Sequence, residues 1–110
     1  MRVLGFSERW NKLDDHCFTT FRFPRKDKDW QVGEVVQLVF KPRSPKREIL
    51  GTATIVSIEK VLVLMAISNR EAVEVGFTNI GAFQKWMVER YPLKRLQEEP
   101  MNKLTLRRLL

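Results

Sequence analysis

Two short segments rich in β-branched and aromatic residues, 18–23 (FTTFRF) and 35–40 (VVQLVF), restrict this chain to a fold built on a β-sheet. Side chains alternate between the two faces of a strand, so Thr20 and Arg22 share one face of the first segment. A hydroxyl and a guanidinium on one face can hold an anion or the polar edge of a nucleotide. The same pair is also common on solvent-facing strands, so the local pattern leaves both interpretations open.

The remaining strands are predicted from short apolar segments at 2–6, 49–58 and 103–110. Residues 35–58 are predicted to form a hairpin of two strands joined by a linker. The linker lies outside the sheet, because it holds two prolines, which are excluded from sheet interiors. The apolar run 60–67 is compatible either with a buried strand or with the start of a helix.

Helices are predicted from capping residues. Ser7 and Glu8 open a short predicted helix that reaches Leu13. Ser68 and Glu71 have the spacing of a capping box, which predicts a second helix start. A third helix is expected from an asparagine cap at position 79 to residue 91, where Pro92 ends it.

Length and composition favour one folded domain over residues 1–110, with 44% hydrophobic residues. No apolar run approaches the roughly 20 residues that cross a bilayer, and polar residues interrupt the N-terminal segment, so neither a membrane anchor nor a signal peptide is expected. The single cysteine, Cys17, excludes an internal disulfide and a multi-cysteine zinc site. We expect a cytoplasmic protein that has neither a metal nor another cofactor.

The net charge of +7 makes RNA, DNA or a nucleotide the default class of partner. The linker between the two hairpin strands carries four cations suited to phosphate contacts along a nucleic-acid backbone, namely Lys41, Arg43, Lys46 and Arg47. A solvated loop and a charge that serves solubility remain the alternatives.

Three sequence features together resemble the ASCH family of the PUA-like superfamily. Thr20-Phe21-Arg22 looks like the end of that family's first motif, glycine-lysine-two residues-threonine-any-arginine. The segment 32–38 (VGEVVQL) is similar to its valine-glycine-acid strand opening, and Val75-Gly76-Phe77 to its glycine-phenylalanine turn, followed by a helix with Phe83, Trp86 and Tyr91. The resemblance implies an α+β fold, a small PUA-like β-barrel with one or two short helices packed at its side and a cleft between them.

Some ASCH proteins remove an acetyl group from acetylated cytidine with a lysine and a threonine of the first motif and a glutamate before the turn. Carried across position by position, the threonine matches Thr20, but the lysine position holds Cys17. The glutamate position holds Val75, with Glu74 one place away, and one residue along a helix rotates a side chain by about 100 degrees. Two of the three catalytic positions are therefore replaced.

Two further residues are candidates for the cleft. Cys17 is a candidate ligand contact, although its neighbour His16 points to the opposite strand face and does not activate the thiol. Trp30 either stacks on a base at the cleft mouth or covers the end of the barrel. Phosphate-binding glycine loops are absent from the sequence, which argues against nucleotide-driven chemistry of the P-loop or dinucleotide kind.

The leading prediction is an RNA- or nucleotide-binding PUA-like module without catalytic activity, with Thr20 and Arg22 in the cleft. One alternative is a small amidohydrolase that acts on acetylated cytidine through Thr20 with altered partners. Another is a protein-interaction domain whose basic surface meets an acidic partner.

Overall fold

The computed structural model describes residues 1–8, 10–65 and 67–109. Arg9 in the predicted first helix, Ala66 in the apolar run and Leu110 at the end of the last predicted strand lie outside these ranges. The described chain is an α+β domain with one five-stranded mixed sheet and three short α-helices. Its elements in chain order are β1 (Arg2–Phe6), the 3-10 helix η1 (Asn11–Asp14), β2 (Cys17–Arg22), β3 (Val35–Phe40), β4 (Glu48–Val61), α1 (Asn69–Glu74), α2 (Ile80–Arg90), α3 (Leu93–Glu98) and β5 (Met101–Leu109).

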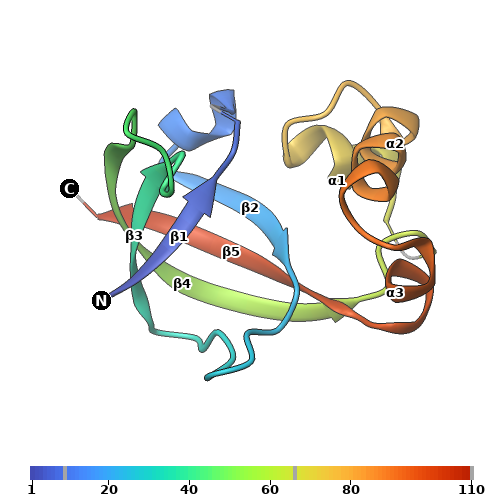
Figure 1. Ribbon diagram of the computed structural model, residues 1–110, viewed down its shortest axis with the longest axis horizontal. Helices are drawn as coiled ribbons and strands as arrows, with labels where there is room; N and C mark the ends of the chain where they lie inside the picture. Colours follow the sequence, from blue (N-terminus) through green and yellow to red (C-terminus); the bar gives the residue numbers. More distant parts are fainter. Residues whose placement is uncertain (9, 66, 110) are drawn as a thin grey trace.

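The strands follow the order β1-β3-β4-β5-β2. β1 runs parallel to β3, and every other neighbouring pair is antiparallel. The two long strands, β4 and β5, extend beyond the rest of the sheet toward the three helices, which gather at that end of the molecule (Figure 1). The predicted hairpin of residues 35–58 is therefore confirmed as β3 and β4.

The sheet is open, and its two edge strands, β1 and β2, form no backbone pairing with each other within the described ranges. Side chains fill the seam between them instead. The rings of Phe6 and Phe18 meet edge to face with their centroids 6.2 Å apart, and the Arg22 guanidinium lies 4.7 Å from the Phe6 centroid. The strand pairing therefore shows an open sheet and not the closed barrel that the sequence predicted.

Two apolar cores hold the domain together. The first lies within the curved sheet and includes Leu4, Phe18, Val36 and Leu106, all buried. The second joins the far ends of the long strands to the helices through residues such as Phe83. Burial of such side chains is the main stabilising contribution to a domain of this size, and here it fixes the helices relative to the sheet.

Capping residues set the helix ends as the sequence predicts. Ser68 accepts a hydrogen bond from the Glu71 amide, and the Glu71 carboxylate accepts one from the Ser68 amide, so the capping box is formed. Past the end of α1, the Gly76 amide donates to Val73 and the Phe77 amide to Ala72, which is a Schellman arrangement. Gly76 has a φ of 111°, a conformation that favours glycine.

Three elements differ from the sequence prediction. The first predicted helix is only the 3-10 turn η1. The apolar run is divided, because β4 continues to Val61 and a turn follows it. Helix α3 was not predicted, since it begins directly after Pro92, whose fixed φ suits the start of a new helix as well as the end of the previous one. None of the described helices is both long and apolar enough to cross a membrane.

Candidate functional site

A cavity of about 680 Å³ lies between the sheet and the helices. Its floor comes from the end of β1 and from β2, one rim from the β3–β4 linker, and the opposite wall from α2 and the turn before it. The volume is in the range of small-molecule binding sites in proteins. This is the place where the ASCH resemblance implies a cleft.

The structure brings Thr20 and Arg22 together on the floor of this cavity. The Arg22 Nε donates to the Thr20 Oγ1 at 3.4 Å, and Thr20 is only 6% exposed. Burial lowers the pKa of the Arg22 guanidinium to about 10. The Arg22 guanidinium remains protonated at neutral pH, so the floor carries a fixed positive charge beside the Thr20 hydroxyl.

Lys12 is one of the cavity residues that the sequence did not predict, together with Arg90 and the aromatic residues of the wall. It lies on η1, is 8% exposed, and its Nζ donates to the Thr19 carbonyl at 2.9 Å. Burial, and then repulsion from Arg22, lowers the pKa of its ammonium to about 7. No carboxylate in the described part of the chain pairs with Lys12 or with Arg22, so two poorly hydrated cations share one hollow.

The β3–β4 linker places two of its four cations, Lys41 and Arg43, on the cavity rim. The linker is held against β1, because the Lys41 amide donates to the Phe6 carbonyl at 2.8 Å and Pro42 packs on Gly5. A side chain at position 5 has no room, since its Cβ would lie 2.6 Å from the Pro42 Cγ. These contacts fix where the rim cations stand relative to the floor.

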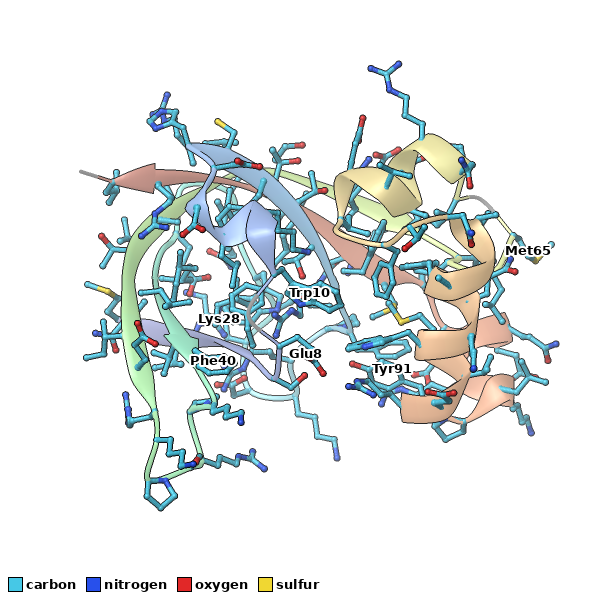
Figure 2. The ribbon with its side chains drawn as sticks, turned by 90° about the horizontal axis from the view of Figure 1, so that it is seen from above. Glu8, Trp10, Lys28, Phe40, Met65 and Tyr91 are labelled. Atoms are coloured by element: carbon cyan, nitrogen blue, oxygen red, sulfur yellow. The ribbon has the colours of Figure 1, made fainter. Side chains whose placement is uncertain are left out.

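Aromatic rings form the wall that faces the floor. The rings of Trp10, Phe77 and Trp86 pack against one another in a triangle, with centroid distances of 5.0 Å (Trp10–Phe77), 5.7 Å (Phe77–Trp86) and 6.0 Å (Trp10–Trp86). Trp10 and Tyr91 both lie in the space between the sheet and the helices, and Glu8 lies nearby at its opening (Figure 2). Arg90 stacks 3.7 Å from the Trp86 centroid and pairs with Glu8 at 3.7 Å, which links the two sides of the opening. Such rings are suited to stacking against a flat ligand.

Cys17 lines a different cavity, of about 740 Å³, which Lys12 also borders. Its thiol is exposed and belongs to an edge strand. Glu74 also lines this second cavity, whereas Val75 lines the first. The one-residue offset from the family glutamate therefore keeps this carboxylate away from Thr20, as the helical rotation predicts.

Trp30 lies in the core of the sheet, 7% exposed, and does not line the first cavity. Arg2 and Arg25 cover its ring at 4.6 and 5.3 Å. Trp30 is thus a buried core residue rather than part of the cavity mouth, and no closed barrel is shown for it to cover. Lys46 and Arg47 are exposed on the linker but are not part of the cavity lining.

The described residues include no group of three His, Cys, Asp or Glu side chains close enough to hold a metal ion. Comparison with protein-family models, curated proteins and solved structures found no match. The functional assignment therefore depends on the chemistry of the cavity itself.

Proposed function

We propose that this domain binds RNA or a nucleotide-like ligand in the cavity between sheet and helices, without catalysing a reaction. The observation that carries the proposal is the cation pair of the floor, the buried Lys12 and the half-buried Arg22, which have no carboxylate partner among the described residues. A buried charge without a partner is costly, and an anionic or acceptor-rich ligand supplies what the protein does not.

The surroundings of these cations support a nucleotide over a simple anion. Lys41 and Arg43 offer phosphate contacts at the opening, and the aromatic wall offers a stacking surface for a base. Membership of the PUA-like superfamily, in its ASCH family, is part of this proposal. It is supported by the position of the cavity and by Phe77 of the glycine-phenylalanine turn, which lines it.

Two charge-matched double variants test where the ligand lies. Lys41→Ala with Arg43→Ala removes two rim cations, whereas Lys46→Ala with Arg47→Ala removes two linker cations outside the cavity. We expect the rim variant to weaken binding of both a mononucleotide and single-stranded RNA. The outer variant should weaken only RNA, with a salt slope reduced by roughly one for each lost phosphate contact.

The floor is tested by Arg22→Gln, with Arg70→Ala as the control because Arg70 is highly exposed and its ion pair is with Glu74 on the surface of α1. Fluorescence anisotropy with labelled RNA should show a loss of roughly tenfold for Arg22→Gln, since a charge-assisted contact is removed. Equal binding by wild type, Arg22→Gln and Arg70→Ala would remove the cavity from the proposal. Binding to an acidic protein that survives nuclease treatment would instead favour the protein-interaction alternative.

One observation favours the amidohydrolase as a second candidate function. Lys12 brings an amine into the cavity with Thr20, although the family lysine position holds Cys17. A pKa of about 7 leaves part of this amine neutral at physiological pH, as a base or nucleophile requires. The test is acetate release from N4-acetylcytidine, with Thr20→Ala and Lys12→Arg as comparisons. Turnover no higher than that of Thr20→Ala would reject the enzyme.

A further inference from the structure

The polar side chains of the cavity are almost all hydrogen-bond donors. Among the described residues that line it there is no Asp, Glu, Asn or Gln. Lysine and arginine cations donate and do not accept, so only hydroxyl groups and backbone carbonyls are left as acceptors. A ligand group that enters the floor therefore meets N–H and O–H hydrogens.

The hydrogen bonds within the floor strengthen this donor character. The Thr20 hydroxyl already accepts from the Arg22 Nε, which leaves its own hydrogen for a ligand. The Lys12 ammonium uses one hydrogen on the Thr19 carbonyl and keeps the others. Three donors from η1 and β2 thus converge on one small region of the cavity.

Purine bases differ in what they present to such a surface. Guanine carries two adjacent acceptors, O6 and N7, whereas adenine carries the N7 acceptor beside the N6 amino donor. An amino group directed at Lys12, Thr20 and Arg22 would face other donors, and each group left unpaired in a buried site costs free energy.

We propose that this cavity selects guanine over adenine by holding O6 and N7 with Arg22, Thr20 and Lys12. This inference rests on the proposed function. The aromatic wall accepts either purine, because every base has a flat face. The phosphate contacts at the opening are also the same for both nucleotides. The floor donors are therefore the specificity-determining groups.

Four monophosphates with the same sugar and phosphate test the inference by isothermal titration calorimetry. IMP keeps O6 and N7 of GMP but lacks its amino group, AMP replaces O6 by the amino group, and 7-deaza-GMP lacks N7. We expect GMP and IMP to bind with similar affinity, AMP to bind roughly tenfold more weakly or worse, and 7-deaza-GMP to lie between them.

Substitutions test whether the floor residues cause the selectivity for guanine. Arg22→Gln should bring the ratio of GMP to AMP affinity close to one, whereas Arg70→Ala, on the exposed face of α1, should leave it unchanged. Circular dichroism melting establishes that each variant is folded, and the wild-type ratio is a test that needs no variant.

The outcomes separate the inference from the function on which it rests. Equal affinity for GMP and AMP would overturn the selectivity and leave nucleotide binding intact. RNA binding without binding of any monophosphate would overturn it as well, because the base would then lie outside the cavity. Failure of every nucleotide and of RNA would overturn both.

Discussion

Replacing Lys12 by methionine should stabilise the free protein at neutral pH. Methionine has a similar length and fills the same space without a charge. The buried Lys12 ammonium has no carboxylate partner in the described chain, and burial lowers its pKa from the ordinary lysine value of 10.5 to about 7. Folding at pH 7 therefore requires either a desolvated cation or the loss of a proton that the unfolded chain would keep.

The magnitude follows from this difference in pKa. Each pKa unit corresponds to about 1.4 kcal/mol, so the lowered pKa costs roughly 5 kcal/mol of the free energy of unfolding at and below pH 7. The substitution also leaves the Thr19 carbonyl without its 2.9 Å hydrogen bond, at a cost of about 1 to 2 kcal/mol. The expected net gain is about 3 kcal/mol at pH 7.

The gain depends on pH in a defined direction. Between pH 7 and 10.5 the unfolded chain binds more protons at Lys12 than the folded one, so the free energy of unfolding of the wild type rises with pH. The advantage of Lys12→Met should therefore shrink above pH 7. Near pH 10.5 it should reverse, because only the lost hydrogen bond remains.

Urea unfolding of the wild type and of Lys12→Met at several pH values measures this difference. Lys85→Met on the exposed part of α2 is the control for replacing a lysine by an apolar side chain. A Lys12→Met protein that is less stable at pH 7, by the same amount as at pH 10, would show that Lys12 is not a buried unpaired cation.

Three further predictions concern ligand binding, the turn after α1 and an ion pair of β1. Binding of an anionic nucleotide should weaken as pH rises above 7, because Lys12 loses its proton, and calorimetry in buffers of different ionisation enthalpy should detect proton uptake on binding. Gly76→Ala should lower the free energy of unfolding by about 1 to 2 kcal/mol in urea, because position 76 has a φ of 111° and a Cβ there would lie 3.0 Å from the Trp10 ring. A double-mutant cycle on Arg2 and Glu34, paired at 2.6 Å with both side chains less than a quarter exposed, should give a coupling of about 1 to 2 kcal/mol, and a value near zero would contradict it.

The strands and the longer helix could be predicted because their signals are local. Alternation and turn residues define β3 and β4, and Asn79 caps α2 by accepting from the Ala82 amide. Helix α3 was missed because it is only six residues long and follows a proline with no polar cap. Chain order alone also did not decide whether the sheet closes, since that depends on how β1 and β2 pack through their side chains.

The candidate site was predictable only in part. Thr20 and Arg22 lie two residues apart on one strand, so their proximity follows from strand geometry. Lys12 gave no such signal, because a lysine beside Leu13 in a short turn is typical of a surface position. Its burial arises from tertiary packing between η1 and β2, which the local sequence does not encode.

The unpaired seam between β1 and β2 determines how sequence changes would alter the width of this cavity. No backbone ladder fixes the separation of these strands, so the volume of the rings between them sets it. Substitution of Phe6 by a smaller or a larger residue would then widen or narrow the floor without breaking any sheet hydrogen bond. Ligand size in related chains should accordingly follow the size of the side chain at this one position.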